Sequence, residues 1–387
     1  MQTLLAVTVL AAIGSSSAFT ELQSMCARDG GRMWGREICG PTLLVDPKTR
    51  EAATFADGVS GSATLPESIG IANTAVDWNG RRWTMVMLPL PEDVIARRAL
   101  LAHESFHRVQ EQLGFAPTSP SNAHLDSADG RYWLRLEWRA LARALALAAE
   151  GSDASPAVRD ALAFRARRRA AFKTAAADER ALEMHEGLAE YTGTALAVPV
   201  VRERAAYLVA KLANAEAQDR FIRNFAYASG PAWGAVIELR DRRWTRRVKS
   251  SDDLGALAAR AWKLAPSDGH ADAYGGAVLR AEEDARETRK QQERAALRAR
   301  FIDGPTLTLP LREMQMVFDP NGLQPLDDRG TVYRSITVSD RWGKIVVTGG
   351  ALMSPDFTKL IVPMGEGYEL SLAPGWEIEG GKVIDKR

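Results

Sequence analysis

The stretch PEDVIARRALLAHESFHRVQEQLG, residues 91–114, decides the fold of the central part of the chain because it predicts one helix with clear ends. Pro91, Glu92 and Asp93 open this helix. A proline there lacks only an N–H group that a first turn leaves unpaired, and acidic side chains favour the positive end of the helix dipole. Gly114 is expected to end it.

His103, Glu104 and His107 lie inside this predicted helix. Residues four apart on an α-helix differ by about 400°, so both imidazoles project from one face, about one turn apart. Two imidazoles in that arrangement can bind one zinc ion, and the carboxylate of Glu104 can accept a proton from metal-bound water. The three positions therefore predict two metal ligands and a general base.

The alternative interpretation is that two histidines on a helix face are satisfied by local carboxylates. The chain has only five histidines, so a chance His-Glu-x-x-His should occur in roughly one such sequence in a few hundred. The pattern also falls in the middle of a helix that follows a predicted β-hairpin. We therefore expect a Zn²⁺ site.

A hydrolytic zinc site has three protein ligands and one open position. No histidine follows His107 at an interval of four to six residues, so the third ligand must come from elsewhere. The best candidate is HEGLAEY, residues 185–191, in which Glu186 and Glu190 are four apart and face the same way on a predicted helix. Such an acid pair between apolar residues needs a cation; the alternative is that it is an exposed helix face. Glu137, in the apolar segment 133–138, is the alternative third ligand. If it is not a ligand, we expect its carboxylate to be buried and paired with Arg135 or Arg139.

HESFH followed by EGLAEY resembles the gluzincin group of zinc metallopeptidases. The resemblance implies that Glu186 is the third ligand and that Glu190 orients a liganding histidine through its other ring nitrogen. The segment 227–230, Tyr-Ala-Ser-Gly, is similar to the Tyr-x-x-Gly of gluzincin aminopeptidases, which implies that Tyr227 stabilises the oxyanion. The resemblance covers residues 82–239, and the long interval after His107 implies an inserted helical segment.

Other charged residues carry weaker signals. His124 could approach the site, or it could belong to a polar loop or a helix cap. His185 points about 100° away from Glu186 on a helix, so we do not expect it to be a ligand. Two arginine clusters are interpreted as solvated helix faces or ion-pair partners rather than as a polyanion site. They comprise Arg165, Arg167, Arg168 and Arg169, and Arg242, Arg243, Arg246 and Arg247.

The N-terminus predicts export. Residues 4–13 are apolar and small residues follow up to Ala18, so we expect residues 1–18 to be a cleaved signal peptide; the alternative is a core helix of an intracellular protein. Cys26 and Cys39 are the two cysteines of the chain and predict a disulfide, with two unpaired buried thiols as the alternative. The predicted localisation is secreted or periplasmic.

The pattern along the chain predicts an α+β fold. We expect a mostly helical zincin-like metallopeptidase domain at 19–280, β-rich over 26–90 with an antiparallel sheet and helical over 91–280. Asn79-Gly80 predicts a two-residue hairpin. A charged helical connector is expected at 281–303 and a small all-β domain at 304–387. The expected helices after Gly114 are 131–149, 155–173, 175–197, 201–217 and 254–264, and the expected C-terminal strands are 306–309, 314–318, 335–338 and 344–348.

Composition limits the possible partners. Among 387 residues, 50 are Lys or Arg and 49 are Asp or Glu, so the net charge of +1 argues against a nucleic-acid binder. After residue 18 no apolar run reaches the roughly 20 residues that a membrane span needs. The sequence therefore predicts a zinc-dependent peptidase with a peptide or protein substrate; the alternative is a non-catalytic zincin-like binding or structural protein of the cell envelope.

Overall fold

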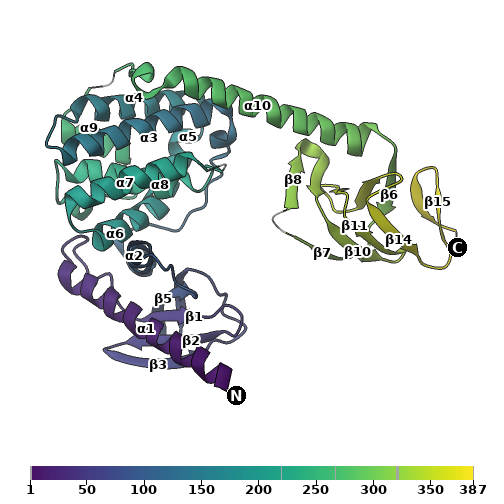
Figure 1. Ribbon diagram of the computed structural model, residues 1–387, viewed down its shortest axis with the longest axis horizontal. Helices are drawn as coiled ribbons and strands as arrows, with labels where there is room; N and C mark the ends of the chain where they lie inside the picture. Colours follow the sequence, from purple (N-terminus) through teal and green to yellow (C-terminus); the bar gives the residue numbers. More distant parts are fainter. Residues whose placement is uncertain (1, 219, 266, 320–321, 387) are drawn as a thin grey trace. The chain divides into compact units, whose positions relative to one another are not determined.

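The structure is a computed structural model that describes residues 2–218, 220–265, 267–319 and 322–386. The chain divides into two units, Met1–Glu283 and Asp284–Arg387. The first unit combines one β-sheet with many helices, and the second is rich in strands (Figure 1). The fold is therefore of the mixed α+β class, as the sequence predicts.

A five-stranded sheet opens the first unit. Its strands, in spatial order, are β3 (Val59–Thr64), β2 (Glu51–Ala56), β1 (Thr42–Val45), β5 (Arg81–Met87) and β4 (Thr74–Trp78). β1 and β5 are parallel, whereas the other neighbours are antiparallel. The prediction of an antiparallel sheet is therefore wrong for this pair. The chain passes through β2, β3 and β4 before it returns beside β1, and such a crossover is what a parallel pair requires.

The predicted hairpin is confirmed. Trp78 pairs with Arg81 across the turn between β4 and β5, and Asn79 and Gly80 have φ angles of 48° and 71°. Both angles are positive, which a type I′ turn requires. Because β4 is the outermost strand on its side, one of its edges lacks a strand partner within this sheet.

Helix α1 (Gln2–Asp29) packs against the sheet and against helix α2 (Figure 1). The ring of Phe19 lies 5.4 Å from that of Phe55 in β2, and Leu22 and Met25 are buried. The carboxylate of Glu21 accepts hydrogen bonds from two arginines of α2, Arg97 and Arg98. The helix is continuous through the predicted cleavage position after residue 18, and the signal peptide stays a prediction.

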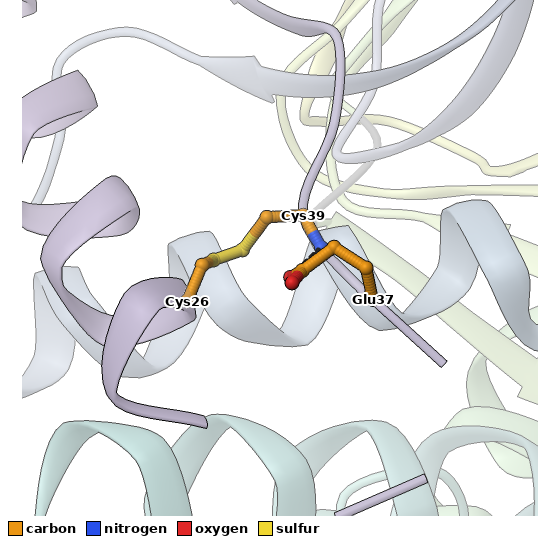
Figure 2. Close-up of side chains that lie close together, drawn as sticks. All are labelled: Cys26, Glu37 and Cys39. Atoms are coloured by element: carbon orange, nitrogen blue, oxygen red, sulfur yellow. Dashed lines mark hydrogen bonds between the residues drawn. A yellow bond between two sulfur atoms is a disulfide. The ribbon is translucent and has the colours of Figure 1, made fainter. Parts of the chain in front are cut away.

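A disulfide joins Cys26 of α1 to Cys39 in the segment before β1, as predicted (Figure 2). Their Cα atoms are 6.0 Å apart. Glu37 lies beside the bond, and its Oε1 accepts a hydrogen bond from the backbone N–H of Cys39 at 3.2 Å. Since both sulfurs are used in the disulfide, this group of side chains does not offer thiolate ligands.

Helix α2 (Val94–Gln110) confirms the prediction that one helix carries His103, Glu104 and His107. It begins later than expected, because Asp93 is its N-cap: the carboxylate accepts a hydrogen bond from the backbone N–H of Ala96 at 2.7 Å. Pro91 and Glu92 therefore precede the helix. A short 3₁₀ turn, η1 (Glu111–Leu113), follows α2, and Gly114 ends it with a φ of 90°.

The remainder of the first unit is helical. Its α-helices are α3 (Ala128–Ala149), α4 (Ser155–Ala171), α5 (Ala175–Leu182), α6 (Leu188–Ala197), α7 (Val201–Glu216), α8 (Phe225–Glu238) and α9 (Leu254–Trp262), and its 3₁₀ turns are η2 (Ala123–Asp126), η4 (Trp244–Arg246) and η5 (Ala271–Tyr274). The sequence did not predict α8. This helix contains Gly230, Pro231 and Gly234, and nearly all of it is buried, so it has no polar face from which to recognise a helical period.

The segment predicted as one helix over 175–197 is interrupted. Between α5 and α6 lies one turn of π-helix, η3 (Glu183–Gly187). A π turn inserts extra backbone into a helix and is frequently found at functional sites. Here it carries Glu186.

The second unit is built from two sheets. Helix α10 (Gly276–Arg298) crosses the boundary between the units and is followed by a π turn, η6 (Ala299–Asp303). The strands are β6 (Thr306–Pro310), β7 (Gln315–Phe318), β8 (Leu323–Leu326), β9 (Gly330–Tyr333), β10 (Ile336–Asp340), β11 (Gly343–Val347), β12 (Ala351–Met353), β13 (Lys359–Pro363), β14 (Tyr368–Leu372), β15 (Trp376–Glu379) and β16 (Lys382–Asp385), with a 3₁₀ turn, η8 (Asp327–Arg329). One sheet has the order β14-β11-β10-β7 and the other β15-β16-β6-β13-β12-β9-β8. Trp342, Ile345 and Leu360 are fully buried in their shared core.

No helix in the described part of the chain is both long and apolar enough to cross a membrane.

Candidate metal centre

The predicted ligand atoms converge on one point. Nε2 of His103 and Nε2 of His107 are 3.0 Å apart, and each lies 3.5 Å from Oε2 of Glu186. Ligands about 2.0–2.1 Å from a tetrahedral zinc ion are about 3.3 Å from one another. The two imidazoles from α2 and the carboxylate from the π turn therefore have the spacing and the chemistry that a zinc site needs.

Carboxylates surround the imidazoles on two sides. Nδ1 of His103 lies 2.7 Å from Oε2 of Glu190, whose Oε1 accepts a hydrogen bond from Lys211 at 2.7 Å. Burial lowers the pKa of His103, but its hydrogen bonds with Glu186 and Glu190 outweigh burial and raise it to about 10. The surroundings thus stabilise positive charge at the ring of His103, as a site for a divalent cation must.

Glu190 stays ionised in this environment. Burial raises its pKa, but the hydrogen bond with His103 and the charge of Lys211 lower it to about 2. An ionised carboxylate at Nδ1 holds the imidazole proton on that nitrogen and leaves Nε2 free to bind a metal.

Glu104 lies beside the histidines and is almost wholly buried. One oxygen of its carboxylate lies within 4.8 Å of one ring nitrogen of His103 and of one ring nitrogen of His107. Oε2 of Glu104 is buried without a hydrogen-bond partner among the described residues. Burial raises the pKa of this carboxyl above its ordinary value. A desolvated carboxylate with a raised pKa is well suited to accept a proton.

Tyr227 of α8 completes the cluster. Its hydroxyl donates a hydrogen bond to Oε2 of Glu186 at 2.7 Å, and its ring stacks on that of His103 with a centroid distance of 5.6 Å and an interplanar angle of 2°. Burial and the hydrogen bond to Glu186 raise the pKa of Tyr227, so its hydroxyl keeps its proton. It is therefore a hydrogen-bond donor within the site.

These side chains line a cavity of about 610 Å³. Residues 73–75, at the start of the edge strand β4, form part of its wall. Tyr207 and Lys211 of α7 and Arg223 line it as well. The cavity thus extends from the first residues of the outermost strand, β4, to the cluster of imidazoles and carboxylates.

Glu137, the alternative ligand, lies elsewhere. Its carboxylate is fully buried and contacts the guanidinium groups of Arg165 and Arg168, at 3.1 and 2.6 Å, and the indole N–H of Trp233. The predicted pairing of Glu137 with Arg135 or Arg139 is wrong, because both of these arginines bind Glu216 instead.

Carboxylates pair with Arg165, Arg168 and His124, whereas His185 lines the cavity. Arg165 and Arg168 are buried ion-pair partners rather than members of a solvated face. His124 lies 2.8 Å from Glu179, a partner of Arg168, and is not among the residues that line the cavity. His185 lines the cavity, with its ring 5.1 Å from that of His107.

Sequence reasoning missed two residues of the site, Gln110 and Lys211. Gln110 is three residues after His107 and seven after His103, so helical spacing alone could have placed it on the ligand face. Lys211 carries no comparable local signal, because it reaches Glu190 from α7, the next helix along the chain, and no short-range spacing relates residues 21 apart.

Gly230 lets α8 approach the π turn. A Cβ atom at this position would lie only 2.3 Å from Cα of Gly187. We expect Gly230→Ala to push the helices apart, to lower the free energy of unfolding by about 1–3 kcal/mol and to move Tyr227 away from Glu186. Denaturant unfolding measures the first effect. Gly70→Ala, where the new Cβ meets open space, should leave the unfolding midpoint unchanged; equal stability of the two variants would contradict this packing account.

Comparison of the chain with protein-family models, curated proteins and solved structures finds no match to any of them.

Proposed function

We propose that this protein is a zinc-dependent peptidase of the gluzincin type that hydrolyses peptide bonds. His103, His107 and Glu186 would hold the ion. The observation that carries this proposal is the convergence of their three ligand atoms, at mutual distances of 3.0 and 3.5 Å, from two segments far apart in the sequence. Beside them, a buried oxygen of Glu104 has no hydrogen-bond partner in the part of the chain that the structure describes, which supports a catalytic site rather than a purely structural one.

Bound zinc would polarise the scissile carbonyl and lower the pKa of a water molecule to around 7. Side chains of the protein would transfer the proton, stabilise the oxyanion and orient the ligands. Glu104 accepts the proton of the attacking water and passes it to the leaving amine. Tyr227 would release its hydrogen bond to Glu186 and donate the same hydroxyl proton to the oxyanion. Glu190 keeps His103 in the orientation that directs Nε2 to the ligand cluster.

The edge strand β4 offers a way to bind an extended peptide. Residues 73–75 line the cavity, and β4 ends the sheet on that side. A peptide that adds to this edge would be held by main-chain hydrogen bonds, which tolerate many side chains. The disulfide between Cys26 and Cys39 supports a secreted or periplasmic location, since disulfides persist in oxidising compartments.

Metal analysis combined with a hydrolysis assay tests the proposal. We expect about one zinc per purified chain and hydrolysis of casein or of a broad peptide library. A chelator should abolish turnover and added Zn²⁺ should restore it. Absence of bound zinc would contradict the proposal. Stoichiometric zinc without turnover on any peptide would instead favour a non-catalytic binding or structural protein of the cell envelope.

A further inference from the structure

Gln110, the last residue of α2, contacts both halves of the proposed metal site. It is buried, with an exposed fraction of 2%. Its Oε1 lies 2.6 Å from Nδ1 of His107. Its Nε2 donates hydrogen bonds to the backbone carbonyls of Met184 and His185, at 3.2 and 2.8 Å. Those two residues belong to the π turn and directly precede Glu186.

The contacts determine which way the amide faces. Carbonyl oxygens only accept hydrogen bonds, so the NH₂ group of Gln110 must face Met184 and His185. Its oxygen then faces His107 and can only accept, which requires the imidazole proton to be on Nδ1. Nε2 of His107 is consequently unprotonated in the neutral ring and directed at Oε2 of Glu186, 3.5 Å away.

We propose that Gln110 is a positioning residue that couples the second histidine ligand to the π turn carrying the third ligand, and so sets the zinc affinity. This inference rests on the proposed zinc function. Glu190 positions only His103, from the helix after the π turn. Gln110 is placed differently, because a single amide holds a ring of α2 and the backbone of η3 at the same time.

A π turn has a particular need for such support. Its hydrogen bonds run from residue i to i+5, and regular α-helix is the usual alternative for the same backbone. A return of residues 183–187 to α-helical geometry would rotate Glu186 away from the imidazoles. The two hydrogen bonds from Gln110 stabilise the observed backbone at the residues just before Glu186.

Zinc affinity, measured by competition with a chromophoric chelator, tests the inference. Gln110→Met fills the same space without either polar contact and is expected to weaken zinc binding by about 10–100-fold. Gln110→Glu keeps an acceptor for His107 but loses the donor to the carbonyls, and it should also bind zinc more weakly than the wild type. The visible spectrum of the Co²⁺ form should change in both variants, because the ligand geometry changes.

Gln112→Met is the matched control. Gln112 lies two residues away, is exposed, and contacts Arg36 rather than the site, so zinc affinity should not change. Unfolding of the metal-free proteins shows whether each variant folds. Gln110→Met with wild-type zinc affinity would overturn the inference, and so would Gln110→Glu with wild-type affinity, because the coupling to the π turn would then be irrelevant. A wild-type protein that binds no zinc would instead contradict the proposed function itself.

Discussion

Glu104→Gln is expected to lower kcat/KM for peptide hydrolysis by about 10²–10⁴-fold and to leave the zinc content at about one ion per chain. Glutamine has nearly the same shape as glutamate but cannot accept the proton of the attacking water. The imidazoles and Glu186 are untouched by the substitution, so metal binding should persist. Steady-state kinetics on one peptide, with zinc measured in the same preparation, separates the two effects.

Glu203→Gln provides the comparison for this experiment. Glu203 is an exposed carboxylate in the first turn of α7 and does not line the cavity. Its replacement should leave both kcat/KM and zinc content unchanged. If Glu104→Gln retained the activity of Glu203→Gln, Glu104 would not be the base and the proposed mechanism would be wrong.

Glu186→Ala is expected to abolish stoichiometric zinc binding. The substitution removes one of three ligands. Zinc affinity should therefore fall by more than the factor of about 10–100 that follows the loss of a residue which only supports a ligand. It also removes the acceptor of the Tyr227 hydroxyl, at 2.7 Å. Zinc content after dialysis and zinc affinity by chelator competition both measure the effect.

Glu137→Gln distinguishes the two carboxylates that the sequence offers as ligands. It should retain zinc, since Glu137 contacts Arg165, Arg168 and Trp233 rather than the imidazoles. It should nevertheless destabilise the protein, because breaking a buried ion pair costs about 3–5 kcal/mol. Zinc lost from Glu137→Gln and kept by Glu186→Ala would reverse the ligand assignment.

The sequence predicts correctly those parts of the fold that are determined by residues close together in the chain. The turn at Asn79-Gly80 and the ends of α2 follow from short-range rules on positive φ and on capping. The parallel pairing of β1 with β5 depends on the path of a long connection, which local patterns do not contain. α8 was not predicted because a helix that is buried on all sides has no amphipathic period in its sequence.

The candidate site divides in the same way. Helical spacing alone brings His103 and His107 together, and their proximity was predictable from one segment. The acid pair Glu186 and Glu190 was offered as the source of the third ligand from its spacing, and the resemblance selected Glu186 from it. The π turn that carries Glu186 was not expected. The partners of Glu137 were predicted incorrectly because Arg165 and Arg168 reach it from α4, whereas sequence proximity pointed to Arg135 and Arg139.

The Cys26–Cys39 bond has a consequence for maturation. Proteolysis after Ala18 would leave only the last turns of α1, and an isolated helix of that length is marginally stable in water. The disulfide would hold this remnant, through Cys26, to Cys39 in the segment before β1. The two cysteines are 13 residues apart in the sequence. The disulfide would then keep three buried side chains of the remnant in the core after cleavage: Phe19, Leu22 and Met25. Reducing agents should therefore increase the mobility of the new N-terminal segment before they affect the rest of the unit.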